Sequence, residues 1–123
     1  MSKTVTQKHA AMVEMLYGKT LNKSLEWELG DGRSPEIALG SYRVRLVDQG
    51  SDDNPLEQIA IFDAFGGFIE SFTDEDIMSE KPKVRTFEAY WQMMQDLRQA
   101  AFRQAVGADR AIDDILDQLD DLL

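Results

Sequence analysis

The sequence contains no cysteine and only one histidine in 123 residues. The absence of cysteine excludes disulfide bonds, thiolate nucleophiles and cysteine-ligated zinc or iron–sulfur centres, so packing must stabilise the fold. The one histidine, His9, stands in a polar N-terminal stretch where the sequence offers it no partner, which argues against a catalytic or metal-binding role. We predict that the protein uses no cofactor and no metal.

Long apolar runs are also missing. No segment approaches the ~20 apolar residues that a membrane-spanning helix requires, and residues 1–11 contain no apolar stretch of signal-peptide length. We therefore expect a cytoplasmic protein with no membrane partner. With 43% hydrophobic residues the chain can form one core that buries roughly two thirds of its unfolded surface. We predict a single domain over residues 1–123.

Positive charge is scarce relative to negative charge. Thirteen Lys and Arg residues against 23 Asp and Glu residues give a formal net charge of −10 at pH 7. Nucleic-acid binding depends on clustered Lys and Arg that neutralise phosphates, so we expect no direct binding to nucleic acid. A protein partner with a basic surface is the more natural complement.

Hydrophobic periodicity predicts three helices. Apolar residues recur at helical spacing over residues 6–21, from Thr86 to a stop at Gly107, and over residues 109–123. We expect Asp109 to cap the last of these helices. A short acidic segment at residues 73–76 is compatible with either a short helix or a loop before Pro82.

Alternating patterns predict four strands between the first two long helices. Residues 25–29 form one strand, and residues 37–47 form a second in which Gly40 marks a bulge. Residues 57–72 form a hairpin, because Gly66-Gly67 can adopt the positive φ angles of a two-residue turn. The prediction is an α+β fold: an antiparallel four-stranded sheet with an N-terminal helix and two C-terminal helices (order α-β-β-β-β-α-α), the helices mainly on one face.

The predicted hairpin brings two carboxylates together. A turn at Gly66-Gly67 sets Asp63 directly opposite Glu70, where like charges disfavour pairing by up to about 1 kcal/mol unless cations neutralise them. The preceding strand offers two arginines as such cations. The resulting candidate interaction surface comprises Arg43, Arg45, Asp63, Phe65, Phe68, Glu70 and Phe72.

This surface has two interpretations. Close carboxylates can form an acid/base dyad or a cation site, but no further ligands or catalytic partners accompany Asp63 and Glu70. A salt-bridged sheet surface facing solvent is the favoured interpretation. Because Phe65, Phe68 and Phe72 lie beside the charges, an exposed apolar patch there would mark contact with a second copy or with another protein.

The last predicted helix carries half of the net charge. Residues 109–123 hold six aspartates and one arginine, which is a local net charge of −5. Its candidate acidic face comprises Asp113, Asp114, Asp117, Asp120 and Asp121, opposite the aliphatic residues Ile112, Ile115, Leu116, Leu119, Leu122 and Leu123. Aspartates oppose the C-terminal dipole and repel one another at i,i+4, so the helix is marginal alone. Its aliphatic side must pack, either on this protein's own core, which we favour, or on a partner.

Several segments together resemble a class of proteins without assigned function. They are Leu25-Glu26-Trp27-Glu28, Tyr42-Arg43-Val44-Arg45, Ile59-Ala60-Ile61-Phe62, Gly107-Ala108-Asp109 and Ile112-Asp113-Asp114-Ile115-Leu116. With the apolar residues of the preceding helix, this arrangement is similar to small uncharacterised α+β proteins of bacteria and their phages or mobile islands. The resemblance implies a bacterial or prophage setting and a similar fold, and no activity.

Three functional hypotheses follow from the sequence. The leading one is a small, non-enzymatic, acidic interaction protein that self-associates and presents the hairpin or the acidic helix to a protein partner. The alternative is a nucleic-acid mimic that inhibits a DNA- or RNA-handling enzyme by occupying its basic channel. The third is a carboxylate-based enzyme that depends on Asp63 and Glu70.

Overall fold

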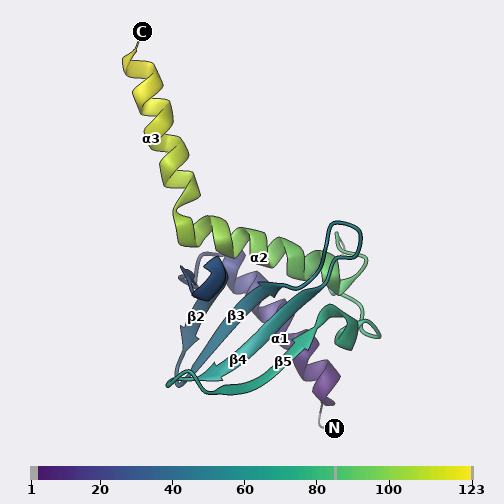
Figure 1. Cartoon of the computed structure of the whole chain (residues 1–123). Coiled ribbons are helices and arrows are strands. Elements are labelled where there is room, and N and C mark those ends of the chain that lie inside the picture. The colour runs from purple at the N-terminus through teal and green to yellow at the C-terminus, as the bar shows by residue number, and fades with distance from the viewer. Residues whose placement is uncertain (1–2, 85, 123) are drawn as a thin grey trace.

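The computed structural model describes residues 3–84 and 86–122. Within these ranges, three α-helices accompany a five-stranded sheet (Figure 1). The helices are α1 (Val5–Leu21), α2 (Tyr90–Val106) and α3 (Ala108–Asp121). The strands are β1 (Glu28–Leu29), β2 (Pro35–Leu39), β3 (Tyr42–Asp48), β4 (Glu57–Asp63) and β5 (Phe68–Thr73), with short 3₁₀ turns η1 (Asp31–Arg33) and η2 (Asp74–Ile77). No helix in the described part of the chain is both long and apolar enough to cross a membrane.

The sheet is an antiparallel meander in the order β1-β2-β3-β4-β5. The α+β class and the antiparallel sheet are confirmed, but the prediction of four strands was wrong. Residues 37–47 do not form one bulged strand, because the chain reverses at Gly40, whose φ is +62°, and Leu39 pairs with Tyr42. Glycine permits both a bulge and a two-residue hairpin turn, so the sequence pattern alone did not distinguish them.

One face of the sheet carries the core. Figure 1 shows α1 lying behind the strands and α2 crossing one end of the sheet. The core joins apolar side chains of both helices to those of four strands and η2. They are Ala10, Val13, Leu16, Ile37, Val44, Leu46, Ile59, Phe72, Ile77, Tyr90, Met93, Met94, Leu97 and Ala101, with Trp27 just before β1.

Local capping chemistry explains the bounds of α1. The Thr4 hydroxyl accepts the N–H of Gln7 at 3.1 Å, and the Gln7 side chain accepts the N–H of Thr4 at 3.0 Å. This reciprocal pair satisfies two donors that the first turn leaves free. The helix predicted over residues 6–21 is therefore confirmed to within one residue.

The second long helix begins later than predicted. The side chain of Gln92 accepts the N–H groups of Glu88 and Ala89 at 2.9 and 3.3 Å, so α2 starts at Tyr90 after the extended residue Ala89. The predicted stop at Gly107 is confirmed, since this residue ends α2 in the left-handed conformation with φ +69°.

The start of α3 also differs from the prediction. The helix begins at Ala108, directly after Gly107, and Asp109 is not its cap. Instead Asp109 Oδ1 accepts a hydrogen bond from Arg103 Nη2 at 2.7 Å. The single left-handed residue between the two helices therefore sets their relative direction, and Figure 1 shows α3 extending away from the sheet and α1.

Candidate interaction surfaces

The seven residues of the predicted interaction surface do not share one face of the sheet. Arg43 pairs with Phe62, and Phe62 with Phe68, on the face away from α1. Phe72 pairs with Ile59 on the opposite face and is buried in the core. Phe65 lies in the β4–β5 loop and is 99% exposed. The prediction of a common face is therefore wrong.

The predicted carboxylate pair is absent because the hairpin register is shifted. An irregularity between Ile61 and Phe62 places Glu70 opposite Ile61, while Phe62 pairs with Phe68. Strand β4 ends at Asp63 and β5 begins only at Phe68, so the turn is longer than the Gly66-Gly67 pair. The observed register is therefore offset by two residues from the predicted pairing of Asp63 with Glu70, and this offset moves Glu70 along the hairpin away from Asp63.

Each of the two carboxylates has a different local partner. Asp63 Oδ1 accepts the N–H groups of Phe65 and Gly67 at 2.9 and 2.8 Å, which closes the loop on itself. Glu70 Oε2 lies 3.0 Å from His9 Nε2 in α1. The predicted cross-strand pairing of Asp63 with Glu70 is therefore wrong, and the enzymatic hypothesis loses the residue pair on which it depended.

The two arginines predicted to neutralise that pair bind a different carboxylate. Arg43 Nη2 and Arg45 Nη2 each lie 3.3 Å from an oxygen of Glu36 on β2. Burial alone would raise the pKa of Glu36, but the hydrogen bonds and charges of the two arginines outweigh it and lower the pKa below its usual 4.5. This cluster stabilises the open face of the sheet.

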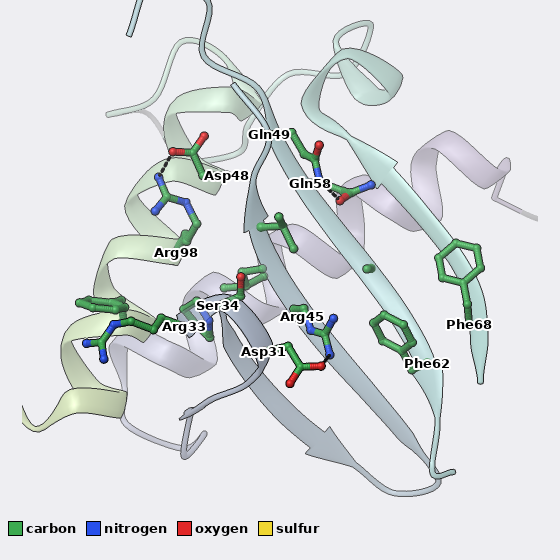
Figure 2. A pocket seen from close by; sticks show the side chains of 16 residues that line it. Asp31, Arg33, Ser34, Arg45, Asp48, Gln49, Gln58, Phe62, Phe68 and Arg98 are labelled. Carbon is green, nitrogen blue, oxygen red and sulfur yellow. Dashed lines mark hydrogen bonds and ion pairs between the residues drawn. The ribbon is translucent and has the colours of Figure 1, made fainter. Parts of the chain in front are cut away.

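A shallow hollow of about 800 Å³ lies on this open face, between the strands, η1 and α2 (Figure 2). Its charged groups are already engaged with protein partners. The Arg33 guanidinium lies over the Phe102 ring at 5.6 Å, and that of Arg45 over the Phe62 ring at 4.7 Å. These contacts hold the two arginines against the protein, although Arg45 Nε has no hydrogen-bond partner among the described residues.

Arg98, which lines this hollow, forms a strong ion pair with Glu57 at the start of β4. Arg98 on α2 donates to both carboxylate oxygens of Glu57 at 2.7 and 3.2 Å, and it lies 3.6 Å from Asp48. Burial raises the pKa of Glu57 even though Arg98 opposes that shift. The pair ties α2 to the start of β4, which gives it a structural role.

Helix α3 is the most unusual surface of the molecule. None of its residues is buried, and the aliphatic side chains Ile112, Ile115, Leu116 and Leu119, with Leu122 directly after the helix, are 46–81% exposed. The expected packing on the protein's own core is therefore wrong for the described residues, while Leu123 lies outside them. The residues of the predicted acidic face, Asp113, Asp114, Asp117, Asp120 and Asp121, are all exposed.

A second exposed apolar surface was missed by the sequence analysis. It is a groove on α1 that contains Met12 and Met15 and is closed on one side by Leu25 and Leu39. The sequence did contain an indication of this groove. Met12 and Met15 widen the apolar stripe of the first helix beyond what one sheet face can cover.

Within residues 3–84 and 86–122, no group of three or more His, Asp or Glu side chains is arranged to hold a metal ion. The chain matches no protein-family model, no curated protein and no solved structure with which it was compared. Its function is therefore inferred from the two exposed apolar surfaces, α3 and the α1 groove.

Proposed function

We propose that the protein is a non-enzymatic protein–protein interaction module that associates with a second copy of itself through α3. One observation carries the proposal: a 14-residue amphipathic helix and its C-cap residue Leu122 leave five large aliphatic side chains 46–81% exposed. Contiguous apolar surface of this kind on a small protein is typical of an interaction site.

The charge pattern of α3 strengthens the argument that this helix has a partner. A helix of this length is marginal in isolation. Asp113, Asp117 and Asp121 repel one another at i,i+4 spacing, and the last of them opposes the C-terminal dipole, at a cost of a few tenths of a kcal/mol for each effect. Since the rest of the domain does not cover α3, burial of the aliphatic stripe in an association would offset these costs.

The test uses full-length variants and measures molar mass by light scattering over a range of concentrations. Leu116→Gln with Leu119→Gln removes the centre of the aliphatic stripe, and Asp114→Asn with Asp121→Asn is the matched control on the far side. We expect a wild-type dimer, a monomeric stripe variant and a dimeric control. A wild-type protein that stays monomeric at high micromolar concentration would overturn the proposal.

The nucleic-acid mimic is a second candidate, because the exposed aspartates of α3 form a projecting row of negative charge. A charge mimic has no need of an aliphatic stripe on the same helix, so self-association is the better supported function. Competition with nucleic acid for a basic enzyme, lost on replacing Asp113, Asp117 and Asp120 by Asn, would favour the mimic.

A further inference from the structure

We infer that α3 of one copy docks into the groove on α1 of a second copy, hereafter the α1 groove. This inference rests on the proposed self-association and names both of its surfaces. The groove has a volume of about 650 Å³ and is lined by Lys3, Lys8, Ala11, Met12, Met15, Leu16, Lys19, Ser24, Leu25 and Leu39.

The floor and walls of the α1 groove are apolar. Leu16 forms part of the floor and belongs to the core, whereas Met15 is 66% exposed and Leu39 is 39% exposed. Methionine adapts its flexible side chain to the shape of a partner, so it is common on helix-binding surfaces. The groove therefore offers a site for the aliphatic side of a helix.

Lysines stand at both ends of the groove. Lys8, Met12, Met15 and Lys19 follow the i, i+4, i+7, i+11 spacing of one helix face, so the two lysines are separated by about 16 Å along α1. Lys3 adds a third charge beside the first end. In the part of the chain that the structure describes, none of these three lysines is in an ion pair.

Helix α3 matches the groove in length and in charge. Its aliphatic stripe runs from Ile112 to Leu122, which is about 15 Å at the rise of an α-helix. Asp113 and Asp120, seven residues apart, lie on one flank of the stripe. An acidic amphipathic helix therefore meets an apolar groove with basic ends, which is the complementarity expected of helix-in-groove recognition.

The pairing of two α3 helices with each other is less favourable. The flank of the stripe that carries Asp113 and Asp120 is acidic, and the other flank carries Ala111 and Gln118. If two α3 helices packed antiparallel, the acidic flanks would face each other and the aspartates would repel. If they packed parallel, each acidic flank would face a neutral flank, and the aspartates would gain no cation. The α1 groove is the better partner because it supplies cations.

The protein's own α3 is directed away from its own groove. The Gly107 N–H bonds to the carbonyl oxygens of Arg103 and Gln104, and Arg103 binds Asp109, so the corner between α2 and α3 is held on both sides. Figure 1 shows the C-terminal end of α3 and the N-terminal end of α1 at opposite ends of the molecule. Reciprocal exchange of α3 between two copies buries two identical contacts, as two-fold symmetry allows.

The first experiment reverses the charge of the groove in the full-length chain. Lys8→Glu with Lys19→Glu should weaken self-association by at least about tenfold, because two attractive pairs become repulsive. The matched control, Lys81→Glu with Lys83→Glu, makes the same change in net charge outside the groove and should leave the dissociation constant unchanged. Analytical ultracentrifugation gives both constants, and circular dichroism verifies that each variant is folded.

The decisive experiment mixes two full-length variants. The groove variant, Lys8→Glu with Lys19→Glu, keeps an intact α3, and the stripe variant, Leu116→Gln with Leu119→Gln, keeps an intact groove. We expect each alone to be largely monomeric and the mixture to form a heterodimer through one intact contact. A mixture that remains monomeric although the wild type is a dimer would overturn this inference.

The outcomes separate this inference from the proposed function. If the stripe variant is monomeric but the groove variant dimerises as the wild type does, self-association through α3 stands and the α1 groove is rejected as its partner. If the wild type is itself monomeric, the proposed function fails first. Restoration of the dimer by combining the groove variant with Asp113→Lys and Asp120→Lys in one chain would identify the lysine and aspartate contacts directly.

Discussion

The imidazole ring of His9 lies flat against the phenyl ring of Phe72, with the ring centroids 4.0 Å apart and the planes inclined by 6°. The same imidazole places its Nε2 atom 3.0 Å from Glu70 Oε2. These contacts join the second turn of α1 to the edge strand β5. The only histidine of the chain thus has a structural role between two elements that are far apart in the sequence.

Replacement of His9 by Ala should lower the free energy of unfolding by about 2 kcal/mol, because both the stacking and the hydrogen bond are lost. Urea titration followed by tryptophan fluorescence measures the change. His9→Phe retains the stacking alone and should lose about half as much. Equal stability of the Ala variant and the wild type would contradict the assigned role.

Replacement of Glu36 by Gln should destabilise the protein at neutral pH by about 2 kcal/mol, because two charge-assisted bonds to Arg43 and Arg45 are weakened. The folded-state pKa of Glu36 is lowered, so its stabilising effect is present above pH 4.5 and is lost as the pH falls through that lower value. The deficit of the variant should therefore shrink below pH 4.5. Thermal unfolding from pH 2 to 7 tests this, with the exposed Glu26→Gln as the control.

Replacement of Arg98 by Met should cost about 3–5 kcal/mol, because it leaves the buried carboxylate of Glu57 without its cation. Burial already raises the pKa of Glu57, and loss of Arg98 raises it further. A raised folded-state pKa means that stability falls as the pH rises above 4.5, so the variant should lose most at neutral pH. Adding Glu57→Gln should recover part of the loss in a double-mutant cycle, and failure to recover any would contradict the pairing.

Replacement of Thr20 by Val should cost about 1–3 kcal/mol, because it leaves a buried donor without an acceptor. The Trp27 indole N–H donates to the Thr20 hydroxyl at 2.9 Å, and that hydroxyl donates to the Leu16 carbonyl at 2.7 Å. Thr20→Ser keeps the hydroxyl and should restore most of the stability. The tryptophan emission spectrum and the urea midpoint report the change.

Removal of residues 108–123 should change the stability of the monomer by no more than about 0.5 kcal/mol, because the described part of α3 buries no side chain. The measurement is urea unfolding at a protein concentration low enough for the full chain to be monomeric. A large loss of stability would mean that α3 packs on the domain in solution.

Much of the secondary structure could be predicted because it depends on short-range pattern and capping. The helix over residues 6–21 and the stop at Gly107 required only periodicity and a left-handed glycine. The errors in strand bounds and turn length came where one sequence pattern permits two backbone geometries. Gly40 allows a bulge or a turn, and the residues after Asp63 allow a two-residue or a longer loop.

The candidate site could be predicted only in part. The aliphatic and acidic sides of α3 follow from the spacing of its residues alone. The α1 groove could not be predicted from residue spacing, because it forms only where Leu25 and Leu39 come beside Met12 and Met15 in space.

Local sequence was sufficient for the α+β class, the amphipathic character of α3 and the concentration of charge at its end, because propensity, periodicity and charge act between residues a few positions apart. The tertiary structure alone decided the hairpin register, the pairing of His9 with Glu70 and the exposure of α3. Each of these depends on which groups compete for the same partner across the fold, and a single left-handed residue, Gly107, decides whether the last helix lies on the core or projects from it.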